Sequence, residues 1–127
     1  MRVATIFMSF LLVALLWDYA AARQGPLSCK VHPKKGTPET KLSSLATVSQ
    51  AEAEHTAVAS LKASAPTTVT EGELEIENGC LVYSFDIRVS GKEGTEEVLI
   101  DAGTGKVLAH EHESAEEESK EGDQEEE

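Results

Sequence analysis

Histidine and cysteine side chains are the groups in this 127-residue sequence with the chemistry of a nucleophile, a base or a metal ligand. An enzyme site needs a nucleophile, a base and an orienting group, or a bound metal ion. The His-Glu-His-Glu run that starts at His110 superficially resembles the zinc-protease motif, but that motif needs a second histidine four positions on, and Ser114 stands there. His32 and His55 fall in separate predicted segments, an arm and a helix. We therefore expect a non-enzyme with no catalytic residue, no cofactor and no defined metal site.

Glutamates gather in two stretches that favour different binding chemistry. Glu71, Glu73, Glu75 and Glu77 alternate along a predicted strand, which gives either the solvated face of that strand or an acidic strip for a basic partner. Residues 110–127 are rich in glutamate and lack large apolar side chains, so they are expected to form a disordered acidic tail. The tail could bind divalent cations weakly through its carboxylates, but it lacks the Asp/Asn and Gly alternation of a calcium loop.

The overall charge excludes two classes of partner. The chain has 23 acidic and 11 basic residues, for a net charge of −12. Nucleic-acid binding requires a basic surface, and binding to an acidic membrane surface requires a lysine or arginine cluster. We therefore expect neither a nucleic acid nor an acidic membrane surface as a partner.

The N-terminal residues 1–22 have the pattern of a signal peptide. Arg2 precedes an uncharged run over residues 3–17, and three alanines ending at Ala22 provide the small residues that a signal peptidase reads. The alternative is an uncleaved anchor, although the run is shorter than the roughly 20 apolar residues that span a bilayer. The sequence thus predicts a protein exported to the periplasm or secreted, with no membrane attachment after cleavage.

Export bears on the two cysteines, Cys29 and Cys80. Oxidising compartments favour disulfides, and one intramolecular pair is possible here. That bond would close a loop of about 50 residues, worth roughly 4 kcal/mol by the chain-entropy estimate. A bond between two chains is the alternative. The strand register proposed below places Cys80 on the solvent-facing side of the sheet.

A single helix is expected over residues 50–64, before the strands. Ser49 and Glu52 have the spacing of a capping box, in which each side chain bonds the other's backbone N–H. Ala53, Ala57 and other small apolar residues follow at helical spacing, and Pro66 ends the pattern. Because the apolar side is mostly alanine, this helix should lie close against a sheet.

A β-hairpin centred on Asn78-Gly79 is the strongest local prediction. Asn-Gly suits the positive φ angles of a type I′ turn, and this turn pairs Leu74 with Tyr83 and Glu77 with Cys80. The register predicts one apolar face made of Leu74, Ile76, Leu81, Tyr83, Phe85, Ile87 and Val89. The other face carries the four glutamates together with Cys80, Val82, Ser84, Asp86 and Arg88.

Two shorter strands complete the predicted sheet. Residues 97–101 form the third strand, a turn follows in which Asp101 caps the backbone, and residues 106–109 form the fourth. The fold class is therefore α+β, with one helix packed on a three- to four-stranded antiparallel sheet. The chain divides into a signal peptide (1–22), an irregular arm (23–42), a folded domain (43–109) and the acidic tail (110–127).

The order of these elements resembles the PepSY domain. The resemblance rests on residues 48–53, 81–85 and 100–108, and its most specific part is the turn motif with Asp101, Thr104 and Gly105. It implies a non-catalytic module of the kind found in propeptides of thermolysin-type proteases and in small exported bacterial proteins. Such modules restrain proteases or bind protein at the cell surface. Because no protease domain follows residue 127, self-inhibition is not expected here, and the Asn-Gly-Cys turn and acidic tail depart from the family pattern.

Two functional hypotheses follow from these features. The first is an exported binding module that docks on or restrains a protease or another envelope protein. The second is a cation-responsive acidic protein that acts through residues 110–127, with the fold serving as a holder.

Overall fold

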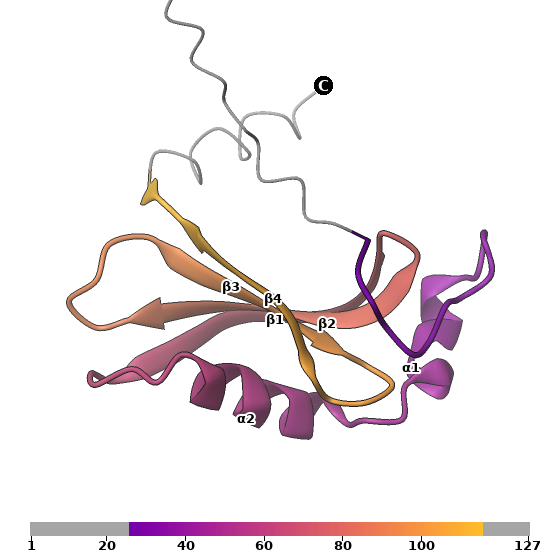
Figure 1. The fold of residues 1–127 in the computed structure, drawn as a ribbon, viewed down its shortest axis with the longest axis horizontal. Helices are drawn as coiled ribbons and strands as arrows, with labels where there is room; N and C mark the ends of the chain where they lie inside the picture. The colour runs from indigo at the N-terminus through magenta and orange to yellow at the C-terminus, as the bar shows by residue number, and fades with distance from the viewer. Residues whose placement is uncertain (1–25, 116–127) are drawn as a thin grey trace, which may run out of the picture.

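A four-stranded antiparallel sheet with one main helix forms the fold, which a computed structural model describes for residues 26–115 (Figure 1). The strands lie in the order β1-β2-β3-β4, and α2 crosses one face of the sheet. This confirms the predicted α+β class. The elements are a 3-10 turn Glu39–Lys41, α1 Leu42–Leu45, α2 Gln50–Ser60, β1 Thr67–Glu77, β2 Cys80–Val89, β3 Thr95–Asp101 and β4 Val107–Glu113.

The helix α2 begins with the predicted capping box. The Ser49 hydroxyl accepts a hydrogen bond from the Glu52 N–H at 3.2 Å, and the Glu52 carboxylate accepts one from the Ser49 N–H at 3.1 Å. The helix ends at Ser60, four residues before the predicted end at Ser64. Lys62 then takes a left-handed conformation with φ of 48°, which turns the chain toward β1 before Pro66 is reached.

Small side chains let α2 lie close to the sheet, as its alanine-rich side predicted. Ala53 and Ala57 are fully buried against Phe85 and its neighbours in the main core. Opposite Phe85, Gly72 has no side chain, and a Cβ there would lie 2.9 Å from the Phe85 ring. The Tyr83 hydroxyl donates to the Val48 carbonyl at 2.7 Å and fixes the segment that enters the helix.

The β1-β2 hairpin has the register that the sequence predicts. Leu74 pairs with Tyr83 and Glu77 with Cys80, and the turn residues Asn78 and Gly79 have φ of 48° and 80°. The predicted apolar face is only partly covered, because Ile76 remains 41% exposed near the end of β1.

A bulge in β1 was not predicted. The pairing with β2 shifts between Val69 and Glu71, so Thr70 has no direct partner. Side chains on a strand alternate between faces, and the extra residue places Val69 on the same face as Leu74. Val69 thereby packs against the main core.

The face of the sheet away from α2 is partly apolar, which corrects the prediction that it is solvated. Cys80, Val82 and Leu99 are buried there and form a second small core. The arm covers them, since Leu27 and Cys29 pack on this cluster, and Leu108 and Ala109 of β4 complete it. Sequence alternation gave the correct face for Cys80 and Val82, but it could not show that the arm covers this face.

Two boundaries also differ from the sequence division. The segment expected to be irregular up to residue 42 contains the turn Glu39–Lys41 and leads into α1, whose Leu42 is buried in the main core. At the other end, β4 runs to Glu113, so the first four residues of the predicted tail are paired with β3. Residues 1–25 and 116–127 lie outside the described part, and so do the predicted signal peptide and most of the tail. Within residues 26–115, no helix is both long and apolar enough to cross a membrane.

Candidate functional site

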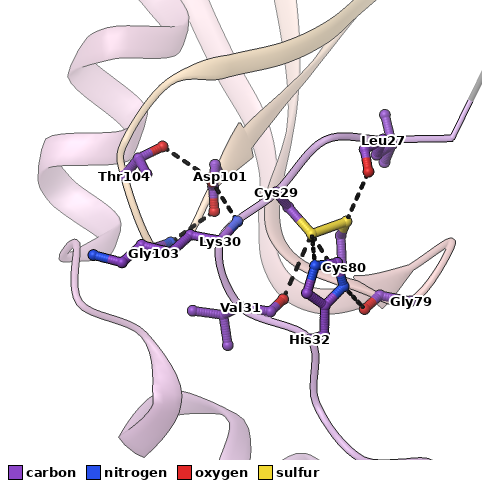
Figure 2. The surroundings of a disulfide bond; sticks show 10 residues. All are labelled: Leu27, Cys29, Lys30, Val31, His32, Gly79, Cys80, Asp101, Gly103 and Thr104. Atoms are coloured by element: carbon purple, nitrogen blue, oxygen red, sulfur yellow. Dashed lines mark hydrogen bonds between the residues drawn. A yellow bond between two sulfur atoms is a disulfide. The ribbon is translucent and has the colours of Figure 1, made fainter.

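A disulfide joins Cys29 of the arm to Cys80 at the start of β2, as predicted (Figure 2). The two Cα atoms are 5.8 Å apart and 51 residues separate the cysteines. Cys80 is fully buried, whereas the sequence predicted a solvent-facing position for it. The difference arises because the arm, including Leu27, packs over this end of the hairpin.

The arm is held to the sheet by backbone hydrogen bonds as well as by the disulfide. The Val31 carbonyl accepts a hydrogen bond from the Leu81 N–H at 3.0 Å. The Lys30 N–H donates to the Asp101 carboxylate at 3.1 Å (Figure 2). Both bonds hold the arm between Cys29 and His32, so the disulfide is one of several anchors.

Asp101 organises the β3-β4 turn in the way that the turn motif predicted. Its carboxylate accepts hydrogen bonds from the Gly103 N–H at 2.9 Å and from the Thr104 hydroxyl at 2.8 Å. Gly105 has φ of 76°, a conformation that favours glycine. The contact of Asp101 with Lys30 was not predicted, because it joins segments 71 residues apart.

Carboxylates cover much of the sheet face that carries the predicted acidic strip. Glu71 pairs with Asp86, and Asp86 in turn pairs with Glu97 on β3. Since directly paired residues share a face, the strip extends across the sheet. A hollow of about 160 Å³ on this face is lined by Glu71, Glu73, Ser84, Asp86, Glu97 and Glu113. We call this set together with Glu75, Glu77 and Glu111 the acidic face.

Burial, followed by charge repulsion, raises the pKa of several carboxyl groups on the acidic face. Burial and then the charges of Glu113 and Glu77 raise the pKa of Glu97 to about 7, although a hydrogen bond from Ser84 opposes the shift. Burial followed by neighbouring glutamates also raises the pKa of Glu75 and Glu77. Loss of water and like charges both disfavour the ionised form, so this face would gain from an added positive charge.

A second charged cluster lies on the opposite face, around Glu96 of β3. His110 Nε2 is 2.6 Å and His112 Nδ1 is 2.9 Å from the Glu96 carboxylate, and Lys92 also contacts it. Burial opposes the charged form of Glu96, but the hydrogen bonds from Lys92, His110 and His112 and the Lys92 charge outweigh it and lower the pKa to about 2. The sequence predicted that His110 and His112 lie in the disordered tail. Their spacing of two residues, typical of side chains on one face of a strand, was the one sequence signal that could have indicated β4.

Within residues 26–115, Cys29, His32 and Cys80 form a group of three potential metal ligands. Their ligand atoms all lie within 4.8 Å of one another, and the two sulfurs are joined. His55 is exposed on α2, on a different element from the arm that carries His32. The structure thus places His32 beside the Cys29–Cys80 disulfide, whereas from the sequence the histidine and the cysteine pair were considered separately.

Comparison with known proteins gives one match. No curated protein and no solved structure matches the chain. Residues 47–111 match the family model described as Peptidase propeptide and YPEB domain, and this range includes α2 and almost all of the sheet. Members of this family are typically non-catalytic, propeptide-like modules in exported proteins. Because the match spans half of the chain and agrees with the turn motif at Asp101, the chain belongs to the PepSY family.

Proposed function

We propose that this protein is a non-catalytic exported module that docks on a protease or another envelope protein and restrains or positions it. The acidic face is the proposed contact surface. The observation that carries the proposal is the gathering of carboxylates from all four strands around one hollow of the sheet face, where an approaching positive charge would stabilise them. The raised pKa of Glu75, Glu77 and Glu97 agrees with this arrangement. A partner with a basic surface would supply that charge and gain both specificity and speed of association.

The β1 edge supports a protein partner rather than a small ion. In the strand order, β1 has β2 on one side and forms an edge of the sheet. A hollow of about 570 Å³ beside it is lined by Thr37, Glu39, Leu42, Glu73, Leu74, Glu75 and Ile76. Ile76 is 41% exposed there, so apolar contact area lies next to the acidic strip. Protein interfaces combine such an apolar centre with a polar surround.

The disulfide supports the proposed export. Disulfides persist in oxidising compartments and are rare where thiols are kept reduced. The Cys29–Cys80 bond therefore agrees with the predicted signal peptide of residues 1–22 and with a periplasmic or secreted location.

Site-specific photocrosslinking in the producing cells tests the proposal. A photoreactive phenylalanine analogue replaces Glu73 in the acidic strip, and the matched control carries it at Ala59, an exposed position on α2. We expect one dominant crosslinked protein with a basic surface from position 73, and none from position 59. The double substitution Glu71→Lys with Glu75→Lys should abolish the crosslink and leave the circular dichroism spectrum unchanged. Equal crosslinking from both positions, or no change with the lysines, would contradict docking through this face.

The alternative function, a response to divalent cations, is proposed for the C-terminal acidic segment. Equilibrium dialysis with Ca²⁺ separates the two functions, because truncation after Ala115 removes residues 116–127, which hold most of the carboxylates of the alternative site, and retains the acidic face. If the truncated chain keeps its partner and loses Ca²⁺ binding, the two functions are independent.

A further inference from the structure

The cluster of Cys29, His32 and Cys80 has the composition and spacing of a metal site that the disulfide now occupies. Cys29 and His32 are three residues apart on the arm, and Cys80 comes from the first position of β2. Figure 2 shows the imidazole of His32 lying beside the two sulfurs. The Cys29 Sγ is 3.6 Å from Nδ1 and 3.7 Å from Nε2 of His32.

The hydrogen bonding of His32 leaves one ring nitrogen available as a ligand. Its Nδ1 lies 3.2 Å from the Gly79 carbonyl oxygen, and a carbonyl can only accept, so Nδ1 carries the proton. The lone pair is then on Nε2, the atom 3.7 Å from the Cys29 sulfur. Histidines that bind metals are held in this way, with the second ring N–H donated to a carbonyl or carboxylate.

The distances fit tetrahedral coordination once the disulfide is opened. Zinc bonds of about 2.3 Å to sulfur and about 2.0–2.1 Å to nitrogen place neighbouring tetrahedral ligands roughly 3.5–3.8 Å apart. The Nε2 to Cys29 Sγ separation of 3.7 Å lies in this range. The two sulfurs must move apart to this spacing after reduction, and Cα atoms 5.8 Å apart leave room for that by side-chain rotation.

The arm has anchors that do not depend on the disulfide. The hydrogen bond between Val31 and Leu81 and the one between Lys30 and Asp101 lie in the Cys29–His32 segment. They involve no sulfur atom, so reduction does not break them. The three ligands therefore stay close to each other in the reduced protein, which lowers the entropy cost of binding a metal.

We propose that the reduced protein binds one Zn²⁺ ion through the thiolates of Cys29 and Cys80 and Nε2 of His32, with solvent at the fourth position. A dithiol reductant supplies two electrons and two protons, the Cys29–Cys80 bond breaks to give two thiols, and the reductant becomes a disulfide. Zinc then displaces the two thiol protons and forms two bonds to sulfur and one to nitrogen. The disulfide and the zinc-bound form are thus alternative states of one site, and this proposal is independent of docking through the acidic face.

Cobalt titration of the reduced chain tests the site directly. The mature protein is reduced anaerobically with a phosphine, which does not compete for metal as a thiol does, and Co²⁺ is added as a spectroscopic probe. We expect one equivalent to produce thiolate-to-cobalt charge transfer in the near ultraviolet and the visible bands of a tetrahedral ion, both removed by Zn²⁺. The oxidised protein should give neither signal. Absence of these bands from the reduced protein, or equal binding by the oxidised protein, would overturn the proposal.

Two histidine variants identify the nitrogen ligand. His32→Ala should weaken Zn²⁺ binding at least 10-fold, because loss of even an outer-shell partner of a metal ligand typically costs 10- to 100-fold. His55→Ala, at an exposed position of α2, should bind Zn²⁺ like the unchanged protein. Equal affinity of the His32 variant and the unchanged protein would exclude His32 as a ligand.

Thermal unfolding tests the proposed site even if reduction of the disulfide destabilises the protein. At a free Zn²⁺ concentration 100-fold above the Kd, the reduced chain should gain about 10 °C or more in Tm, or recover its folded circular dichroism spectrum. The double variant Cys29→Ser with Cys80→Ser should show no gain. A reduced chain that Zn²⁺ neither stabilises nor refolds would refute the proposed site.

Discussion

Glu96 and Glu97 are adjacent on β3, yet the fold drives their pKa values in opposite directions. Their side chains point to opposite faces, Glu96 toward Lys92 and two histidines and Glu97 toward other carboxylates. Replacing each in turn by glutamine removes the charge with little change of volume. We expect Glu96→Gln to destabilise the protein and Glu97→Gln to stabilise it, with different dependence on pH.

For Glu96, the folded-state pKa of about 2 lies below the ordinary glutamate pKa of 4.5. The charged form therefore stabilises the fold fully above pH 4.5, and this contribution is lost as the pH falls toward 2. A shift of this size corresponds to about 3 kcal/mol, since each pKa unit is worth about 1.4 kcal/mol. Glu96→Gln should thus lower the free energy of unfolding by about 2 to 3 kcal/mol between pH 5 and 8, and by roughly half as much at pH 3.

For Glu97, the folded-state pKa is raised to about 7, so the folded protein retains a proton that the unfolded chain loses. Stability then falls as the pH rises from about 4.5 to 7 and is lowest above that range. The raised pKa corresponds to a destabilisation of the charged, folded protein of at most about 3 kcal/mol. Because Glu97 is half-buried, solvent screening reduces this destabilisation to about 1–2 kcal/mol. Glu97→Gln should therefore add about 1–2 kcal/mol at pH 8 and less than about 1 kcal/mol at pH 5.

Urea denaturation followed by circular dichroism, at pH 3, 5 and 8 with the disulfide intact, measures both effects. Glu93→Gln, in the exposed β2-β3 loop, controls for the general loss of one negative charge. The reasoning fails if the two variants shift stability in the same direction. It also fails if the effect of Glu97→Gln is the same at pH 5 and pH 8.

Three other predictions concern the disulfide, the β2-β3 loop and the end of β4. Replacing Cys29 and Cys80 together by alanine should cost about 4 kcal/mol by the chain-entropy estimate, measured by urea denaturation, and a loss below about 1 kcal/mol would contradict that estimate. Gly91 and Gly94 both have φ near +80°, but a Cβ at Gly94 would lie 2.1 Å from a backbone oxygen of β4. Gly94→Ala should therefore cost about 1 to 3 kcal/mol more than Gly91→Ala, and equal Tm values would contradict this packing. Ending the chain at Ala109 should lower Tm by several degrees because it removes both histidines from Glu96, whereas ending it at residue 115 should not.

Features set by adjacent residues were predictable from the sequence. The capping box at Ser49 and the turn at Asn78-Gly79 depend on a few consecutive residues, and the turn then determines the pairing of β1 with β2. The bulge at Thr70 could not be predicted, because it allows Val69 to reach a core that several other elements build.

The limits of sequence prediction are clearest for β4 and the two faces of the sheet. Residues 110–113 are polar, so the sequence predicted them as part of the disordered tail. In the structure they belong to β4, where His110 and His112 pair with β3 and contact Glu96. The glutamates of β1 were recognised as a strip, whereas the contribution of Glu97 depends on the strand order. Such contacts join residues distant in sequence, and no local pattern encodes them.

The position of the disulfide also determines what proteolysis can do to this protein. The covalent ring from Cys29 to Cys80 contains both α-helices, all of β1 and the hairpin turn. A single cut inside that ring, for example at the exposed Lys62 after α2, leaves the two fragments covalently joined, with the acidic strip still attached to β2. A cut in the β2-β3 loop, outside the ring, leaves β3 and β4 held only by noncovalent pairing. The proposed contact strand β1 therefore lies in the part of the chain that one cleavage inside the ring leaves as a single covalent piece.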